Sequence, residues 1–449
     1  MKSGEKLLII GGGGGGFAVA TRAKELMPDI DITLIRKEKR FIVRCSLPYV
    51  VSGLVTPESI VNSDRKFIDT GINVIVDEVM KVDPINKSAI LSDGRELSYD
   101  KLVMAVGARP VIPPVEGCDL SGVFTLRSLS DAERMRAFMD EKKPRKMVFV
   151  GAGFITLELA ASILSVSPGS YEITVVELLD RPLPMMLDPE FSERVRNYMV
   201  EKGMKMRMGR KVERILGNNG MVCGVLLDNG EHIDTDMVFL NVGVRANLDL
   251  AKGMGLEIGR YGIKTNEYME TSNQDIFALG DCAEKKHFIT GKPVPGMLRG
   301  PAIIAGRHIA KRLAGYHVPF PGVLDNAVVK LFDKSIAFVG LTELQAREEG
   351  FDPVCATVDS RSKHAMMPGV KPWTIKLVFD KKSKKLIGGQ ILSDADISAK
   401  EIDTVNALIL GGKTVYDLCS LMCAGQPEMS SEPSAEPICI AAERALVKM

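Results

Sequence analysis

The stretch LLIIGGGGGG at residues 7–16 joins a short apolar strand directly to six glycines. A helical stretch follows to about Met27, and a second apolar strand covers residues 32–35. A strand, a glycine turn, a helix and a second strand make a βαβ unit, which builds parallel sheets. Gly11, Gly13 and Gly16 fit the G-x-G-x-x-G spacing, in which backbone N–H groups at a helix start approach a pyrophosphate. The stretch predicts a dinucleotide site; a glycine-rich loop before an ordinary helix is the alternative.

The same pattern returns about 140 residues later. An apolar strand precedes GAG at residues 151–153, a helix is expected from Phe154 to about residue 164, and the strand 173–176 ends at Glu177. Thr156 stands where a third glycine would allow close helix packing. Two such units predict two nucleotide-binding domains, with the second inserted into the first.

The residues that end the second strand of each unit bear on the adenosine half of the nucleotide. Glu177 can accept hydrogen bonds from the ribose hydroxyls of NADH and repel the 2′-phosphate of NADPH, whereas Arg181 leaves NADPH open. A plain surface acid is the alternative for Glu177. The first unit instead ends in Arg36 and Lys37. Either backbone groups and Lys37 hold the adenosine, or Glu38 reaches round, or flavin binding is weakened.

Composition excludes several classes of protein. The chain has 449 residues, 45% apolar and 26% charged, with a net charge of +1 and eight cysteines. Disordered and fibrous classes are excluded, and nucleic acid and membranes are poor partners. The first apolar run is too short for a signal or spanning segment, so we expect a cytoplasmic protein. The Cys and His spacings predict no metal site.

The order of these patterns predicts an α/β fold with two Rossmann-like domains and a C-terminal α+β domain. The apolar runs 102–107 and 238–243 each close on a glycine, as a repeat would. Strands are expected at 327–332, 335–339, 373–379 and 386–392, with helices at 343–349, 399–410 and 439–448. We place the domain limits at residues 1–115 and 246–324 for the first domain, 116–245 for the second and 325–449 for the third.

A third nucleotide signal is the stretch IFALGD at residues 276–281. This pattern predicts a strand that is followed by Asp281 and then by a helix. A carboxylate there can bind a ribityl hydroxyl of FAD. A strand followed by Gly-Asp is by itself an ordinary turn, and the specificity comes from its combination with the glycine turn at 11–16 and the stretch AVGARP at 105–110.

Together these motifs resemble the FAD-dependent pyridine nucleotide-disulfide oxidoreductase family over essentially the whole chain. Cys45 is followed five places on by Val50, so the C-x-x-x-x-C redox disulfide of one branch is absent. FIVRCSLPY at residues 41–49 is similar instead to the single-cysteine branch, which holds coenzyme A disulfide reductases, persulfide reductases, NADH oxidases and NADH peroxidases. The resemblance implies a homodimer in which the third domain serves dimerisation.

The resemblance also implies which residues contact the cofactors, FAD and NADH, with NADPH as a further candidate. The cofactor-binding residues are expected to be Gly11, Gly13, Gly14, Gly16, Arg36, Lys37, Arg44, Val79, Ala105, Gly107, Gly280, Asp281, Gly151, Gly153, Phe154, Ile155, Glu158, Glu177 and Gly243.

Cys45 is the expected catalytic residue, with a buried structural cysteine as the alternative. The thiolate is the reactive form of cysteine, and the neighbouring Arg44 is expected to lower the pKa of Cys45. Electrons would pass from NADH through the flavin to Cys45, which attacks a sulfur of the substrate and forms a mixed disulfide. The alternative functions are an NADH oxidase and an NADH-dependent reductase of a small electron-transfer protein, with Cys45 a bystander.

Other positions bear on the substrate. Oxidases and peroxidases of the branch usually carry a histidine where this chain has Gly14, which favours a disulfide, persulfide or polysulfide substrate. The serine and asparagine that help to hold coenzyme A are missing from residues 41–45, and the usual C-terminal tyrosine is missing from residues 424–427. These losses predict a roomier pocket. Arg22 and Arg44 are candidates for substrate phosphate or carboxylate, against plain solvated charges.

Cys419 and Cys423 stand four residues apart and would share a face if that stretch were helical. One hypothesis is that Cys419 or Cys423 acts as a redox relay with Cys45 of the partner chain. The alternative has both packed as small apolar groups.

Overall fold

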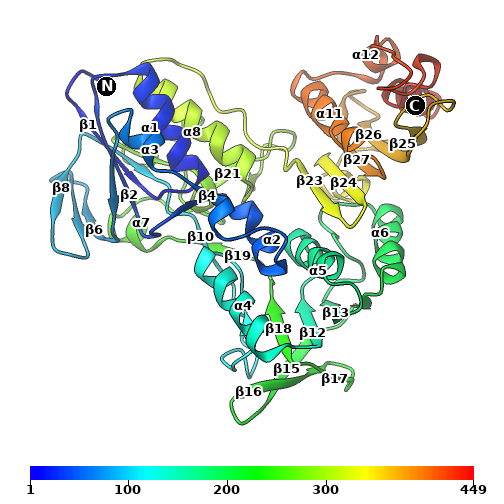
Figure 1. The fold of residues 1–449 in the computed structure, drawn as a ribbon. Coiled ribbons are helices and arrows are strands. Elements are labelled where there is room, and N and C mark those ends of the chain that lie inside the picture. Colours follow the sequence, from blue (N-terminus) through cyan, green and yellow to red (C-terminus); the bar gives the residue numbers. More distant parts are fainter.

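The chain folds around a parallel sheet that begins with the first apolar strand. The computed structural model describes residues 1–449, apart from the side chain of Lys66. The sheet has the order β20-β9-β1-β2-β5, with all neighbours parallel. Helices α1 (Gly14–Leu26) and α8 (Arg299–Leu313) pack against each other beside it (Figure 1). Its strands are β1 (Lys6–Ile10), β2 (Asp31–Arg36), β5 (Asn73–Val76), β9 (Lys101–Met104) and β20 (Ile276–Ala278).

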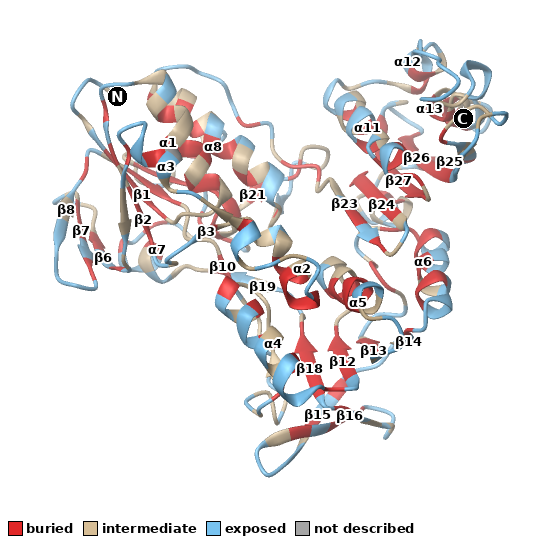
Figure 2. Ribbon diagram, in the orientation of Figure 1, coloured by how far each residue is buried: buried red, intermediate tan, exposed pale blue. Residues whose placement is uncertain are grey.

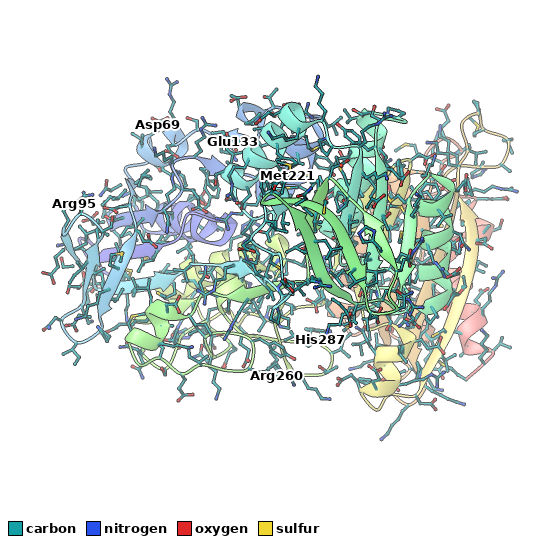
Figure 3. The ribbon with its side chains drawn as sticks, turned by 90° about the horizontal axis from the view of Figure 1, so that it is seen from below. Asp69, Arg95, Glu133, Met221, Arg260 and His287 are labelled. Atoms are coloured by element: carbon teal, nitrogen blue, oxygen red, sulfur yellow. The ribbon has the colours of Figure 1, made fainter. Side chains whose placement is uncertain are left out.

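A second parallel sheet comes from the middle of the chain. Its order is β11-β18-β12-β13-β14, and α5 (Phe154–Val166) follows β12, as the second βαβ unit predicted. A smaller antiparallel sheet, β15-β16-β17, faces the viewer in Figure 3, where Met221 is labelled. The strands are β11 (Val123–Phe124), β12 (Lys146–Val150), β13 (Glu172–Glu177), β14 (Lys205–Met208), β15 (Val212–Asn218), β16 (Met221–Leu227), β17 (His232–Asp234) and β18 (Met237–Leu240).

Two short antiparallel strands, β10 (Ala108–Pro110) and β19 (Val244–Ala246), carry the chain between the two parallel sheets. The boundary placed after residue 115 lies in the connection that follows β10, whereas the one placed after residue 245 falls inside β19. The domain limits therefore stay predictions.

The C-terminal part of the chain forms an antiparallel sheet with helices packed against it, in agreement with the expected α+β architecture. The order is β23-β24-β27-β26-β25, and β25 (Pro353–Arg361) is a strand that the sequence pattern did not predict. The other strands are β23 (Ala327–Leu331), β24 (Lys334–Gly340), β26 (Pro372–Asp380) and β27 (Leu386–Ser393). The helices are α9 (Glu343–Glu348), α10 (Asp396–Ala399), α11 (Glu401–Leu410), α12 (Val415–Cys419) and α13 (Pro437–Leu446).

The helix expected directly after Asp281 is wrong. Gly280–Cys282 form a 3-10 turn, and the next helix, α8, begins only at Arg299. Pro293 and Pro295 lie between them, and proline has no backbone N–H to donate inside a helix.

Buried residues follow the strands of all three large sheets (Figure 2). In the part of the chain that the structure describes, every helix is too short or too polar to cross a bilayer.

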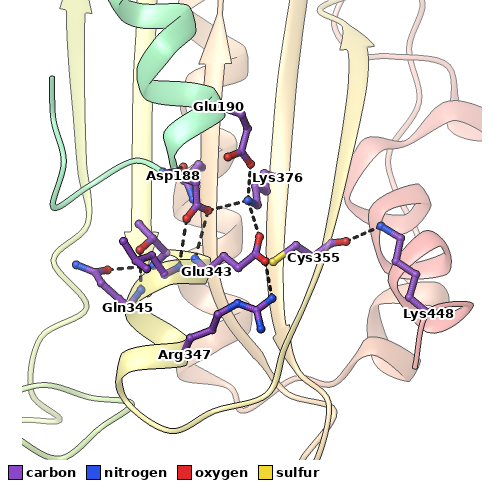
Figure 4. A network of polar contacts seen from close by, with 11 residues as sticks. Asp188, Glu190, Glu343, Gln345, Arg347, Cys355, Lys376 and Lys448 are labelled. Carbon is purple, nitrogen blue, oxygen red and sulfur yellow. Dashed lines mark hydrogen bonds and ion pairs between the residues drawn. The ribbon is translucent and has the colours of Figure 1, made fainter. Parts of the chain in front are cut away.

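A buried charge network joins the second sheet's domain to the C-terminal sheet (Figure 4). The Asp188 carboxylate, before α6 (Pro189–Glu201), accepts hydrogen bonds from the backbone N–H of Glu343 and from Gln390 Nε2. The ammonium of Lys376 lies 2.9 Å from Asp188, and both side chains are at most 3% exposed. Lys376 also contacts Glu190, whose side chain is 54% exposed. A buried charge needs its partner because water cannot solvate it, so Asp188 is the critical member.

We expect Asp188→Ala to destabilise the C-terminal domain by about 3 kcal/mol, because it removes the one fully buried carboxylate that Lys376 contacts and leaves the partly exposed Glu190 and Glu343. Trp373, the one tryptophan, lies on the same strand as Lys376, so its fluorescence during urea unfolding reports on this domain. Glu190→Ala removes an exposed contact and should cost less than about 1 kcal/mol. Equal losses in the two variants would contradict the assignment.

Candidate functional site

A cavity opens where the first sheet, helix α5 and the C-terminal domain meet. Segments far apart in the sequence line it. They are residues 12–16, Arg36, Glu38, residues 40–42, Arg44, Cys45, Leu47, Pro48, Ala105, Gly107, residues 126–127, Phe154, Ile155, Glu158, residues 279–281, residues 297–299, Ala302 and residues 327–329.

The turn between β1 and α1 admits no side chain at two of its glycines. A Cβ on Gly11, whose φ is +118°, would lie 2.1 Å from the carbonyl oxygen of Ala105, and one on Gly16 would lie 2.0 Å from that of Gly11. The N-cap, Gly13, makes no side-chain hydrogen bond, and the first turn of α1 carries no acid. The first N–H groups of α1 therefore meet the cavity without competition from a side chain, which fits the pyrophosphate of FAD.

Arg36, at the end of β2, is buried and neutralised. Its guanidinium donates to both carboxylate oxygens of Asp64, at 2.7 and 2.6 Å, while its buried Nε has no partner among the described residues. Lys37 pairs with Glu78 and does not line the cavity. Glu38 does line it and is paired with Arg44, and its role toward an adenosine ribose stays a prediction. Val79, expected near FAD, is buried in β6 (Val79–Asp83) and does not line the cavity.

Cys45 lies in a 3-10 turn (Arg44–Ser46) that leads into α2 (Leu47–Ser52). Its side chain is exposed to the cavity, whose walls nevertheless reduce its hydration. This desolvation raises the pKa of Cys45, and the Glu158 and Asp281 carboxylates add to the rise. The guanidinium of Arg299, at the start of α8, opposes them by favouring the thiolate.

The expected influence of Arg44 on Cys45 is corrected by the structure. The Arg44 guanidinium is paired with the Glu38 carboxylate, so its charge is largely balanced. The cation that lowers the pKa of Cys45 is Arg299, which is distant in sequence.

Glu158, on α5, receives a hydrogen bond from the hydroxyl of Tyr49 at 2.7 Å. Burial raises the pKa of Glu158 despite this bond. Burial and the Glu158 carboxylate together raise the pKa of Tyr49, so its hydroxyl remains a donor. Glu158 is therefore a cavity carboxyl that holds its proton more readily than an exposed one.

Asp281 lies in the 3-10 turn after β20 and lines the cavity. Its carboxylate is 2.6 Å from a guanidinium nitrogen of Arg127, which also donates to the Ala108 carbonyl. Arg127 fixes Asp281 at the wall, where the carboxylate retains acceptor capacity for a ligand hydroxyl.

The second glycine turn, residues 151–153, lies directly before the first residue of α5. Glu177 accepts hydrogen bonds there from the N–H groups of Ala152, at 2.6 Å, and Leu179, at 2.9 Å. Thr156 is fully buried and accepts a hydrogen bond from Asn241, which explains a threonine at the third glycine position. Gly151, Gly153, Glu177 and Gly243 do not line the first cavity, whereas Phe154, Ile155 and Glu158 do. Helix α5 thus connects the two nucleotide turns.

A basic groove runs between α1 and α8. Four cations line it, with Glu25 as the one carboxylate among the lining residues. Arg22 is paired with that Glu25 at 2.6 Å. The lining residues are Gly14, Phe17, Ala18, Thr21, Arg22, Glu25, Arg299, Ile303, Arg307 and Lys311. Gly14 and Arg299 also line the cavity that holds Cys45, so groove and cavity are adjacent.

Cys419 and Cys423 do not share a helix, because α12 ends at Cys419. The nearer neighbour of Cys419 is Cys439, whose Sγ lies 3.4 Å from the Cys419 carbonyl oxygen. All eight cysteines are free thiols. A relay between either cysteine and Cys45 of the partner stays a prediction.

Sequence reasoning missed Tyr49, Arg127, Arg299, Arg307 and Lys311. Tyr49 lies four residues after Cys45, and Arg299, Arg307 and Lys311 share α8, but these segments and Arg127 lie far apart in the chain, so no local motif connects them to one another. The one local signal is Arg299, a cation in the first turn of a helix, where anions are favoured and a cation is unfavourable.

Comparison with known proteins agrees with this geometry. The pyridine nucleotide-disulphide oxidoreductase profile matches residues 5–299, and the dimerisation domain of the same family matches residues 327–436. An NADH oxidase of Methanocaldococcus jannaschii is 33% identical, over 99% of each chain. An NAD(P)H coenzyme A polysulfide/persulfide reductase of Pyrococcus horikoshii is 33% identical, over 92% of each chain.

Solved structures agree with these sequence relatives. An NAD-dependent persulfide reductase from A. fulgidus superposes with a TM-score of 0.93 at 33% identity, over 99% of this chain and 83% of that one. The chain therefore belongs to the pyridine nucleotide-disulphide oxidoreductase family, which implies FAD and NAD(P)H as cofactors, and it carries the family's dimerisation domain.

Proposed function

We propose that this enzyme is a homodimer that uses NADH, and NADPH less well, to reduce a disulfide, persulfide or polysulfide at Cys45. The favoured substrate class is a thiol derivative that carries phosphate, such as a coenzyme A disulfide or persulfide. The observation that carries the proposal is the basic groove, which meets the Cys45 cavity at Gly14 and Arg299. A cytoplasmic location remains a prediction.

The charge of the groove supports this substrate class. Arg307 and Lys311 make no ion pair with any described carboxylate, so they are available to an incoming anion. Arginine and lysine bind phosphate through charge-assisted hydrogen bonds. A substrate with its sulfur at Cys45 and its phosphates between α1 and α8 would use both parts of the site.

Cys45 carries the sulfur chemistry in this proposal. Its thiolate attacks one sulfur of R–S–S–R′, a Cys45–S–S–R bond forms, and R′S⁻ leaves. Bound FAD supplies the electron pair of NADH, which returns Cys45 to the thiolate and releases RSH. The sum is NADH + H⁺ + RSSR′ → NAD⁺ + RSH + R′SH, and a persulfide RSSH gives RSH and H₂S in the same way.

Arg299 and Glu158 have opposite roles at the thiol. Arg299 favours the thiolate that attacks, whereas the charge of the Glu158 carboxylate favours the thiol. Tyr49 holds the Glu158 carboxyl at the cavity wall. The start of α5 directs a nicotinamide nucleotide from the Glu177 turn toward the same cavity.

The names of the relatives support this proposal and also favour a second candidate function, that of an NADH oxidase. The P. horikoshii and A. fulgidus proteins are named for persulfide reduction, and the M. jannaschii relative is named NADH oxidase. Dioxygen is the substrate of that second candidate, and a small electron-transfer protein is a third acceptor that the experiment includes.

Cys45→Ser should lower NADH-dependent reduction of coenzyme A disulfide and persulfide at least about a thousandfold, as loss of a catalytic nucleophile does. Bleaching of the flavin by NADH and reduction of an artificial one-electron acceptor should persist. Turnover is measured by NADH absorbance with each acceptor in turn. The matched control is Cys118→Ser, which removes a thiol outside the cavity.

Sulfur reduction that survives Cys45→Ser would refute the role of Cys45. Faster turnover with dioxygen than with any sulfur compound in the unaltered enzyme would favour the NADH oxidase.

Two variants should move the pKa of Cys45 in opposite directions. Arg299→Met removes the cation that favours the thiolate, so the pKa of Cys45 should rise. Glu158→Gln removes a negative charge, so the pKa should fall. The rate of iodoacetamide labelling of Cys45 against pH, followed by mass spectrometry, measures both. A shift of the same sign in both variants would contradict this electrostatic account.

Arg307→Gln and Lys311→Gln together should raise KM for coenzyme A disulfide at least about tenfold, because each removes a charge-assisted contact to phosphate. Reduction of pantethine, which has the same sulfur end without the phosphates, should change by less than about twofold. The control Arg260→Gln removes an exposed cation outside the groove (Figure 3). Equal losses on both substrates would argue against a phosphate site.

A further inference from the structure

Lys285 is a buried cation behind the wall of the Cys45 cavity. It lies in β21 (Lys285–Lys286), which pairs with β22 (Pro293–Val294), and it is 4% exposed. Its ammonium donates hydrogen bonds to the carbonyl oxygens of Gly280 and Pro295, the latter at 3.0 Å. Neither the cofactor motifs nor the sulfur chemistry accounts for this residue.

The two carbonyl partners belong to different parts of the cavity wall. Gly280 adjoins Asp281, and both line the cavity. Pro295 precedes the lining residues Met297, Leu298 and Arg299, which lead into α8. One ammonium therefore connects the 3-10 turn after β20 with the segment before α8.

A third segment of the cavity wall interacts with Lys285 electrostatically. Asp325 lies two residues before Ala327, which lines the cavity. The Asp325 carboxylate interacts electrostatically with Lys285 and with the buried His287. Burial raises the pKa of Asp325 and lowers those of Lys285 and His287, and opposite charges counteract these shifts. For Lys285 the counteracting carboxylates are those of Asp281 and, more weakly, Asp325. The cluster therefore connects three cavity segments.

The hydrogen bond to Gly280 has a consequence for Asp281. A trans peptide is planar, so its carbonyl and the following N–H point in opposite directions. A Gly280 carbonyl held toward Lys285 turns the Asp281 N–H the other way, and within the described chain nothing accepts a hydrogen bond from that N–H. Arg127 separately holds the Asp281 carboxylate. The backbone donor and the side-chain acceptor of Asp281 are thus both fixed from behind.

We propose that Lys285 is a positioning residue for the flavin site: it holds the Gly280 and Pro295 carbonyls and so presents the Asp281 N–H and the start of α8 to the cofactor. The proposal depends on the family's FAD and not on the identity of the sulfur substrate. A lysine is suited to this task because one ammonium has three donors and needs no acceptor role.

The competing explanation is that Lys285 only balances the charges of Asp281 and Asp325, of which Asp281 is also paired with Arg127. The double variant Lys285→Met/Asp325→Asn separates the two, because it removes the charges of Lys285 and Asp325 and also takes the ammonium away from the Gly280 and Pro295 carbonyls. Among the residues described, the Gly280 carbonyl then keeps only the hydrogen bond from the backbone N–H of Ala283. Lys376→Met is the matched control, since Lys376 is a lysine equally buried among carboxylates but outside the cavity.

The measurement is the dissociation constant of FAD, titrated into apoprotein and followed by flavin fluorescence, with the thermal midpoint of each apoprotein recorded alongside. Lys285→Met and the double variant should both weaken FAD binding at least about tenfold, because hydrogen bonds from a charged donor are lost. The double variant should regain the thermal midpoint of the unaltered apoprotein more closely than the single variant does. If the single variant fails to fold, the double variant alone decides.

Lys376→Met should lower the thermal midpoint while FAD affinity stays within about twofold of the unaltered protein. FAD binding by the double variant within about twofold of the unaltered protein would overturn the proposal, because charge balance alone would then explain Lys285. Equal weakening by Lys376→Met would overturn it as well, because general loss of stability would explain the effect.

Discussion

The close approach of Gly11 to the Ala105 carbonyl is the constraint on which the site depends. It requires a backbone without Cβ at a positive φ, and it brings the end of β1 against the end of β9. Helix α1 can then start at the cavity with its first N–H groups unobstructed. The cost of six consecutive glycines is a flexible unfolded chain and a weak first helical turn. The packing of α1 against α8 compensates for that weakness, because a backbone contact at Gly306 lets the two helices approach closely.

The reactivity of Cys45 follows from a balance between burial and charge. Desolvation and two carboxylates favour the thiol, and Arg299 alone among the principal influences from side chains favours the thiolate. A raised pKa lowers the fraction of thiolate, which is the form that oxidants attack. Arg299 also lines the groove. A substrate anion that pairs with Arg299 would reduce its effect on Cys45, so the remaining groove cations matter for keeping Arg299 free to act on sulfur.

Local patterns predicted the sheets and the glycine turns, because strand, turn and helix signals lie within a few tens of residues. They failed where the outcome depends on contacts between distant segments. The helix expected after Asp281 gave way to a short turn because Lys285 and two prolines organise the following residues. Arg44 was assigned to Cys45 by adjacency, whereas Glu38, six residues earlier in the sequence, neutralises it. Arg127 and Arg299 reach the cavity from separate elements, and Tyr49 acts on it through Glu158. The strand β25 was missed although the buried Val354, Ala356 and Val358 alternate with less buried residues.

The electrostatics of the groove also bear on the choice between sulfur and oxygen as electron acceptor. Dioxygen is small and uncharged, so a row of cations between two helices gives it no binding energy. Unpaired cations on adjacent helical turns repel one another and would lower stability without an anionic ligand. Arg299, Arg307 and Lys311 repeat along one side of α8 at intervals that place them together, and Arg22 faces them from α1. A multiply charged substrate that neutralises these cations during turnover would explain the arrangement. The sulfur of that substrate would then lie at the end of the groove next to Cys45.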